Sequence, residues 1–506
     1  MSRKTFIGAS LSGVLIGISF NTLWGWLTFV GLVPLFLVIR ELKPNESYLA
    51  GIWASFLFYL LSLQWIYIAL HTYGSTSAVL SVGALVLLAL ILSLLTGAAI
   101  PLALSLHRKC RIPLFLALAV SWVVIDFARE SFPMGGFPWS TLAMPQAFSP
   151  LLIQIADLTG IWGITFLIVW INAVLAEVLL IRANGFFSKV FATLILFGAV
   201  FGYGEYRLHQ WRHLDPNLPR LSAGLIQGSI PQELKFSKKN ADLQLEVYQK
   251  KAARLQESVD LIVWPEAAWP YPLPIDLETL SPELLGLEPS EKQNPYSLIG
   301  AVLEEGAKDG EKHYFNGAVL FNAQGEALES YQKIKRVPFG EYIPFAELIS
   351  FLHPVATSEG FVAGISANPL SVGWAKVGPL ICYEDIFPEM ARTMVRHGAH
   401  LLVNLTNDAW YGVSAAPYQH LALSIFRAVE TRRFLLRATN TGISAVVGAS
   451  GEVVAKTPLR QRAVLVYQAP LLTGETLYVK WGDWFALGCV CFVTLTVLYE
   501  RIKRKN

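Results

Sequence analysis

Residues 78–100 read AVLSVGALVLLALILSLLTGAAI and form part of a longer stretch, Ser47 to Leu106, that contains no Asp, Glu, Lys or Arg. A helix of about 20 apolar residues crosses the ~30 Å hydrocarbon core of a bilayer. Only 15% of the 506 residues are charged, whereas a soluble globular protein has roughly a quarter. The sequence therefore predicts a membrane protein and excludes a wholly soluble enzyme, a disordered chain and a collagen-like chain.

Charged residues gather in one region, Leu214 to Arg336, which contains all four charged types. This contrast predicts one large part of the chain that faces water. The formal net charge is only +3, which is too small to indicate binding to the phosphate backbone of a nucleic acid. We therefore expect no nucleic-acid partner.

Further apolar stretches bring the predicted number of membrane spans to eight. Thr5 to Ile39 is long enough for two short spans that break at Asn21-Thr22, and Ser47 to Leu106 holds two more, broken at residues 71–76. The other four spans are predicted at residues 113–125, 161–181, 190–203 and 484–499.

Basic residues mark alternate loops between these spans, and cytoplasmic loops of membrane proteins carry an excess of Lys and Arg. The residues on the basic side are Arg3, Lys4, Arg40, Lys43, Arg108, Lys109, Arg111, Arg182, Lys189, Arg501, Lys503, Arg504 and Lys505. The short loops on the opposite side hold only Arg129. Both termini are therefore expected in the cytoplasm, and the region between the last two spans is expected outside it.

Three parts follow from this topology: a membrane domain with seven spans (1–203), an extracytoplasmic domain (204–481), and a final span with a basic tail (482–506). In the middle part, runs rich in Val, Ile and Leu alternate with helical patterns, which predicts a layered α/β domain. Strands are predicted at 223–226, 261–264, 296–303, 317–321, 377–382 and 401–405, a hairpin at 443–447 and 452–456, and helices at 241–259, 388–397 and 418–437.

Cys382 is the only one of the four cysteines in the predicted outer domain. Cys489 and Cys491 lie inside the last span, and Cys110 lies in a cytoplasmic loop, so Cys382 has no disulfide partner on its side of the membrane. An unpaired cysteine in an oxidising compartment is either buried or reactive. Because Cys382 ends an apolar strand, where α/β domains place reactive groups, we favour a nucleophile.

Two other segments carry groups that could assist a thiol. Glu266 follows directly on the apolar run 261–264 and Pro265, and its carboxylate could take the thiol proton. Lys333 ends the run Tyr331-Gln332-Lys333, and its ammonium could stabilise both a thiolate and an oxyanion. A Glu or a Lys at the end of a strand is more often an ordinary surface residue. The prediction therefore depends on the combination of Glu266, Lys333 and Cys382.

A Glu, a Lys and a Cys in that order, each at the end of a strand, resemble the nitrilase superfamily, whose members use the Cys as nucleophile and pass through a thioester. The finer resemblance is to the apolipoprotein N-acyltransferase family, and it covers nearly the whole chain. The blocks that carry it are WPE (264–266), YQK (331–333), VPFGEYIP (337–344), ICYE (381–384), NDAWYG (407–412), PYQH (417–420) and RATNTGISA (437–445).

This resemblance implies a bacterial inner-membrane protein with eight transmembrane helices and a periplasmic nitrilase-like domain, an α-β-β-α sandwich, before the last span. It implies a ping-pong reaction that completes lipoprotein maturation. Cys382 takes the sn-1 acyl chain of a phospholipid, commonly phosphatidylethanolamine, as a thioester. The α-amine of the N-terminal diacylglyceryl-cysteine of an apolipoprotein then accepts the chain. The implied partners are these two lipid substrates and the bilayer, with the protein acting as a monomer.

The same resemblance assigns roles to individual residues. Glu266 is the acid and base, Lys333 and the main-chain N–H of Tyr383 hold the oxyanion, and Glu341 and Glu384 support them. We expect no metal and no cofactor, because an amine opens a thioester unaided and the sequence has no metal-ligand cluster or phosphate-binding Gly loop.

Four aromatic residues are candidate substrate contacts. Trp139 ends the outer loop 131–139, Trp410 and Tyr411 could form a lid at the acyl entrance, and Phe236 stands where the family often has Trp. Ordinary anchoring in the aromatic belt of the membrane is an equally good explanation for Trp139, Trp410 and Tyr411.

Three other functions remain open from the sequence. A membrane-tethered amidase of the nitrilase type would use water in place of the amine. A transporter or receptor would use an inactive nitrilase fold for binding, although its spans show no paired intramembrane charges. A papain-like Cys-His enzyme would need a histidine, and only His397 and His400 lie near the Cys382 block.

Overall fold

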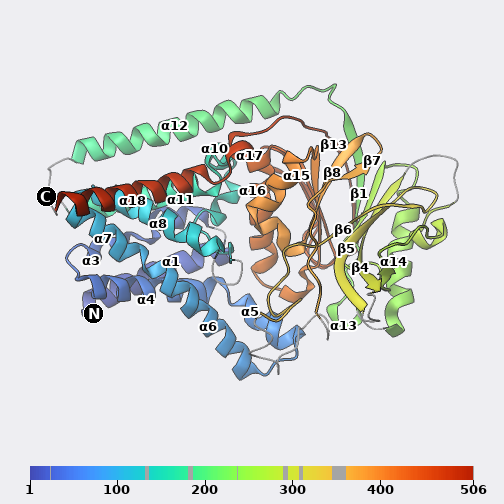
Figure 1. Ribbon diagram of the computed structural model, residues 1–506, viewed down its shortest axis with the longest axis horizontal. Helices are drawn as coiled ribbons and strands as arrows, with labels where there is room; N and C mark the ends of the chain where they lie inside the picture. The colour runs from blue at the N-terminus through green and yellow to red at the C-terminus, as the bar shows by residue number, and fades with distance from the viewer. Residues whose placement is uncertain are drawn as a thin grey trace. The chain divides into compact units, whose positions relative to one another are not determined.

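The computed structural model describes the whole chain apart from residues 23, 132–135, 181–185, 236–237, 289–294, 307–311, 345–359 and 505–506. The described chain divides into two compact units. The helical unit comprises residues 1–213, 413–426 and 481–506, and the α/β unit comprises residues 214–412 and 427–480. Figure 1 labels the helices and strands of both units.

The helical unit is built from long apolar helices joined by short helical turns. Its helices are α1 (Arg3–Thr22), α2 (Thr28–Gly31), α3 (Val33–Ile39), α4 (Pro44–Ser62), α5 (Trp65–Ile68), α6 (Ala78–Gly97), α7 (Ala99–Cys110), α8 (Leu114–Ser131), α9 (Pro150–Ile153), α10 (Ala156–Thr159), α11 (Ile161–Leu180), α12 (Phe186–Arg212) and α18 (Trp484–Lys503). Small residues let these helices approach closely. A Cβ on Gly13 of α1 would lie 2.4 Å from the main-chain oxygen of Ala54 in α4, and one on Gly51 would lie 2.7 Å from the oxygen of Gly97 in α6.

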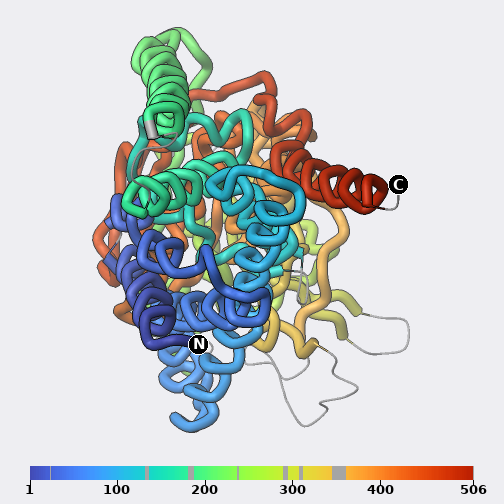
Figure 2. The backbone as a smooth tube through the Cα atoms, turned by 90° about the vertical axis from the view of Figure 1, so that its left-hand side faces the viewer, coloured from blue at the N-terminus to red at the C-terminus, as the bar shows by residue number. Residues whose placement is uncertain are grey.

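Within the described residues, five helices are long and apolar enough to cross a membrane, or six if the bent pair Pro44–Ser62 and Trp65–Tyr73 counts as one span. Most side chains of α12 and α18 are not buried inside the protein, and Figure 2 shows both helices at the edge of the helical unit. Apolar side chains left exposed on long helices suit a lipid environment. The prediction of a membrane protein is confirmed.

The predicted count of eight spans is not reached by these helices. The second predicted span is divided into short helices within residues 25–39. The fifth corresponds to α8, which has 18 residues and carries Asp126 and Arg129 as a buried ion pair. Hydropathy shows only that a stretch is apolar, whereas the turn at Leu32, between α2 and α3, determines how far one helix runs.

The α/β unit contains two sheets between α14 (Ala241–Ala253) on one side and α15 (Pro388–Arg396) on the other (Figure 1). The first sheet has the strand order β13-β1-β2-β4-β5-β6, with β3 paired to β4, and the second has the order β12-β11-β10-β9-β8-β7. The strands are β1 (Arg220–Gln227), β2 (Leu261–Trp264), β3 (Leu273–Pro274), β4 (Tyr296–Gly306), β5 (Lys312–Phe321), β6 (Ala327–Gln332), β7 (Leu370–Val372), β8 (Ala375–Ile381), β9 (Leu401–Thr406), β10 (Leu435–Thr439), β11 (Ala445–Val447), β12 (Val453–Lys456) and β13 (Ala463–Pro470).

The central strands of both sheets pair in parallel: β2 with β1 and β4, and β9 with β8 and β10. Parallel strands are covered on both faces and therefore read as continuous apolar runs. This explains why the predicted strand 261–264 has the bounds of β2, and why the strands predicted at 223–226, 377–382 and 401–405 overlap β1, β8 and β9. The parallel pairing brings the carboxyl ends of β8 and β9 to the same edge of the second sheet.

The helix predicted at 418–437 is wrong at its carboxyl end. Helix α16 (Ala416–Thr431) ends before Arg432, whose φ of 50° lies in the left-handed region, and Leu435 begins strand β10. A left-handed residue is a common helix terminator, but Leu435 and Leu436 continue the apolar spacing of the helix. The sequence pattern therefore does not show where α16 ends and β10 begins.

Candidate active site

Cys382 is the first residue after β8 and begins a short 3₁₀ turn, Cys382–Ile386. Its φ of 49° lies in the left-handed region, which is uncommon for a residue other than glycine and persists only where its surroundings hold it. Asn404 of the neighbouring strand β9 donates from Nδ2 to the main-chain oxygens of Leu380 and Cys382, at 3.3 Å each. All four cysteines are free, so Cys382 is unpaired, as predicted.

Glu266 lies in a tight turn that begins where β2 ends. The main-chain N–H of Ala268 donates to the oxygen of Pro265 at 3.2 Å, and Ala267 between them has a φ of 46°. The turn packs directly on Gly300 of β4, where a Cβ would lie 2.2 Å from the Pro265 oxygen. Only glycine at position 300 leaves room for this turn.

Lys333 follows β6 directly and is almost fully buried, with 1% of its surface exposed. Its Nζ lies 2.9 Å from Glu341 Oε1 and 3.6 Å from Glu266 Oε1. Burial opposes the charged form, but the carboxylates of Glu341 and Glu266 outweigh it and raise the pKa of Lys333 above its usual value. The side chain is therefore an ammonium at neutral pH.

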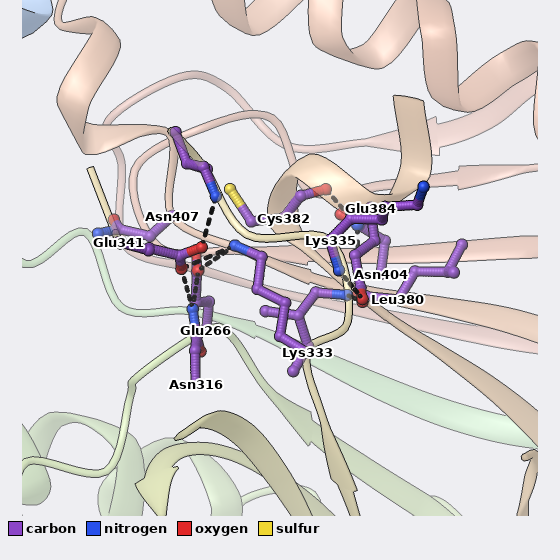
Figure 3. Close-up of polar contacts among 12 residues, drawn as sticks. Glu266, Asn316, Lys333, Lys335, Glu341, Leu380, Cys382, Glu384, Asn404 and Asn407 are labelled. Atoms are coloured by element: carbon purple, nitrogen blue, oxygen red, sulfur yellow. Dashed lines mark hydrogen bonds and ion pairs between the residues drawn. The ribbon is translucent and has the colours of Figure 1, made fainter. Parts of the chain in front are cut away.

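Asn316 of β5 joins the two carboxylates around Lys333. Its Nδ2 donates to Glu266 Oε1 at 2.7 Å and to Glu341 Oε1 at 2.8 Å (Figure 3). The second carboxylate oxygen of Glu341 accepts from the main-chain N–H of Val337 at 2.8 Å. Each carboxylate is thus held in place by donors that do not take part in the chemistry of the thiol.

The thiol of Cys382 is protonated at rest. Burial raises the pKa of Cys382, the negative charge of Glu266 raises it further, and the positive charge of Lys333 only partly offsets this. Figure 3 shows the Cys382, Glu266 and Lys333 side chains converging from the ends of three strands. The geometry therefore suits a nucleophile whose proton is removed by a neighbouring base during the attack rather than beforehand.

Glu384 ties the Lys333 segment to the Cys382 turn. Its buried carboxylate accepts from the Tyr331 hydroxyl at 2.8 Å, from the main-chain N–H of Ile334 at 2.6 Å and from that of Ile381 at 2.7 Å. Burial raises the pKa of Glu384 to about 7, although these hydrogen bonds and the charge of Lys333 lower it. The carboxylate fixes the ends of β6 and β8 to each other.

The four aromatic residues predicted to contact substrate lie in different parts of the chain. Trp410 and Tyr411 are half-buried in a turn after β9. Burial raises the pKa of Tyr411, and the neighbouring ionisable groups Cys382, in its thiolate form, and Asp408 raise it further, so Tyr411 lies near the proposed catalytic groups. Trp139 belongs to the helical unit, where it is fully buried and donates from Nε1 to Gln419 Oε1 at 2.8 Å. Phe236 lies outside the described residues. Their roles as substrate contacts stay predictions.

Sequence reasoning missed several buried polar residues of this region. Besides Asn316 and Asn404 they include Arg437 of β10, which donates to Asp385 Oδ2 at 2.7 Å and to Asp408 Oδ2 at 3.0 Å. Only Asn404, a polar residue inside the predicted apolar strand 401–405, carried a sequence signal, because Asn316 lies just before the predicted strand 317–321 and Arg437 ended the predicted helix 418–437. Among the described residues, no group of three or more His, Cys, Asp or Glu side chains could hold a metal ion.

Two family models match the chain. Residues 12–174 match the apolipoprotein N-acyltransferase N-terminal domain, and residues 222–476 match the carbon-nitrogen hydrolase domain. The apolipoprotein N-acyltransferase of Geobacter metallireducens is 35% identical over 503 residues, which cover 96% of this chain and 94% of that protein. This chain belongs to the apolipoprotein N-acyltransferase family.

A second member of this family, from Azotobacter vinelandii, is 33% identical and covers 94% of the chain and 92% of its own length. Among solved structures, a carbon-nitrogen hydrolase from Helicobacter pylori G27 is 18% identical, with a TM-score of 0.35, and the match covers 50% of this chain and 89% of that one. The full-length likeness to N-acyltransferases confirms the predicted enzyme class and family.

Proposed function

We propose that this acyltransferase moves the sn-1 acyl chain of a phospholipid to the α-amine of the N-terminal diacylglyceryl-cysteine of an apolipoprotein, through a thioester on Cys382. The observation that carries the proposal is a buried, protonated thiol next to the Glu266 carboxylate, with an ammonium 3.6 Å from that carboxylate. Glu266, Lys333 and Cys382 are then the catalytic residues.

In the first half-reaction, Glu266 accepts the proton of the Cys382 thiol as sulfur attacks the carbonyl carbon of the sn-1 ester. A C–S bond forms, and the carbonyl oxygen becomes an oxyanion. The Lys333 ammonium and the main-chain N–H of Tyr383 stabilise this oxyanion. When the intermediate collapses, the C–O ester bond breaks, and Glu266 returns the proton to the departing oxygen, which leaves as a lysophospholipid.

In the second half-reaction, the neutral amine of the diacylglyceryl-cysteine attacks the thioester carbonyl. Glu266 takes a proton from the attacking nitrogen, an amide C–N bond forms, and the C–S bond breaks. The proton then passes to the sulfur and restores the thiol. The enzyme returns to its resting state without an external co-reactant.

The surrounding residues support these steps. Glu341 holds the Lys333 ammonium at 2.9 Å, and Glu384 holds the segments that carry Lys333 and Cys382. Trp410 and Tyr411 would cover the acyl entrance, and Trp139 and Phe236 would contact lipid. Phosphatidylethanolamine is the expected donor, and the protein is expected to act as a monomer.

Both substrates are membrane lipids, so the proposal includes a location. The chain would cross the bacterial inner membrane eight times, with both termini in the cytoplasm. Residues 1–203 and 482–506 would form the membrane part, and residues 204–481 would form the periplasmic catalytic domain. The distribution of Lys and Arg supports this orientation.

The acceptor tests this function most clearly. Purified protein in detergent would be given phosphatidylethanolamine labelled in the sn-1 chain, together with a diacylated lipopeptide, and the labelled products would be separated. We expect label in the lipopeptide as an amide, and none when its α-amine is acetylated. Free labelled fatty acid as the main product in the presence of the free amine would favour the tethered amidase instead.

A further inference from the structure

A second buried lysine lies next to the proposed base. Lys235 ends the short helix α13 (Gln232–Lys235) with 3% of its surface exposed, and its Nζ donates to the main-chain oxygen of Glu266 at 2.6 Å. Burial lowers the pKa of Lys235 to about 8, while the Glu266 carboxylate, and Cys382 once it is a thiolate, act in the opposite direction. The Lys235 ammonium therefore lies within electrostatic reach of both groups.

The hydrogen bond from Lys235 reaches a strained turn. Ala267, with a φ of 46°, directly follows the carbonyl that Lys235 binds, and non-glycine residues keep such a conformation only when neighbours over-determine it. On the other side of the turn, Gln244 of α14 donates from Nε2 to the Ala268 oxygen at 2.8 Å. Lys235 and Gln244 therefore hold the two ends of the segment that aims the Glu266 side chain.

The positive charge of Lys235 also matters for the charge balance of the site, because Glu341 and Glu266 share the single ammonium of Lys333. Lys333 Nζ is closer to Glu341, at 2.9 Å, than to Glu266, at 3.6 Å. Two carboxylates thus share one ammonium unless a second cation is present, and buried carboxylates without a cation are costly. With Lys235 included, two ammonium groups balance two carboxylates around a neutral thiol.

We propose that Lys235 is a positioning residue that acts through Glu266: it fixes the Glu266 turn and offsets the negative charge of its carboxylate. The proposal rests on the thioester mechanism above, in which Glu266 must be ionised before it can accept the thiol proton. Lys333 serves the oxyanion in the same mechanism, so the two lysines have different tasks.

The test compares Lys235→Met and Lys235→Arg with wild type. The matched control is Lys250→Met, which changes an exposed lysine of α14 that pairs with Glu246. The single-turnover rate of thioester formation from phosphatidylethanolamine is measured from acidic to mildly basic pH, and thermal unfolding is recorded for each variant.

For Lys235→Met we expect the rate at neutral pH to fall about tenfold or more, and the acidic limb of the pH profile to move to higher pH, because an ionised carboxylate loses a neighbouring cation. Lys235→Arg keeps the positive charge and should keep the wild-type pH profile of the rate. If Lys235→Met does not fold, the pH profile of Lys235→Arg is the test of the proposal. Lys250→Met should match wild type.

A Lys235→Met rate within about twofold of wild type, or a lower rate with an unmoved pH profile, would overturn the role of Lys235. A Lys235→Arg profile displaced from that of wild type would overturn it as well. A wild-type protein that forms no thioester on Cys382 would instead overturn the proposed function itself, so the two failures can be told apart.

Discussion

Gly300→Ala should cripple thioester formation while leaving the fold intact. The new Cβ would lie 2.2 Å from the Pro265 oxygen and 2.8 Å from the Cα of Glu266. Since real Cβ contacts stay above 3.0 Å, the turn must move by about 0.8 Å relative to β4. A misplacement of about 1 Å at a reacting group can cost roughly a hundredfold in rate. We therefore expect acylation to slow by roughly 10- to 100-fold.

The strand offers its own control. Gly306 lies in the same strand β4, and a Cβ added there would meet no atom within 4 Å. Gly306→Ala should therefore keep the wild-type rate. The assay is quenched-flow formation of the Cys382 thioester, followed by intact mass, with thermal unfolding measured in parallel. Equal rates for the two variants would refute the claim that the Glu266 turn depends on the missing Cβ.

Three further predictions concern the buried polar residues around the site. Asn316→Leu removes a hydrogen bond to the charged Glu266, which is worth about 1.5–3 kcal/mol. Single-turnover acylation should therefore slow by roughly 10- to 100-fold. An unchanged rate with a normal melting curve would contradict this. Burial raises the pKa of Glu384 to about 7, so the folded protein binds this proton more tightly than the unfolded chain, and stability should fall by about 3 kcal/mol as pH rises from the ordinary carboxyl pKa to 7. Glu384→Gln should flatten that dependence in thermal unfolding, and parallel curves for the two proteins would argue against it. Arg437→Met leaves Asp385 and Asp408 without the cation between them and should lower the free energy of unfolding by about 3–5 kcal/mol. The Tm should fall for this variant but not for Arg462→Met, a control at an exposed site. Equal Tm values for the two variants would show that the cation is dispensable.

The three residues proposed as catalytic stand out in the sequence because each follows a strand, and two of these strands have an easily recognised apolar pattern. Residues 261–264 are fully buried in a parallel sheet, so they read as an uninterrupted apolar run, and the polar residue that ends such a run is conspicuous. Cys382 stands out in the same way after β8. Their order along the chain, with Lys333 between them, then matches one family pattern.

The positioning residues could not be predicted because tertiary pairing brings them to the site. Asn316 lies one residue before the predicted strand 317–321 and reaches Glu266 and Glu341 only through the pairing of β5 with β4 and β6. Lys235 comes from a single helical turn with no periodic pattern. Edge strands such as β6 and β13 alternate between partly buried and exposed residues, and they resemble loops in the sequence for that reason.

In the proposed mechanism, Cys382 carries the transferred acyl chain. The most direct measurement is the intact mass of the protein and of Cys382→Ala after incubation with phosphatidylethanolamine that carries palmitoyl at sn-1 and oleoyl at sn-2. We expect that wild type gains one palmitoyl group, that neutral hydroxylamine removes it, and that Cys382→Ala gains nothing. A palmitoyl adduct on Cys382→Ala, or an oleoyl adduct on wild type, would contradict it.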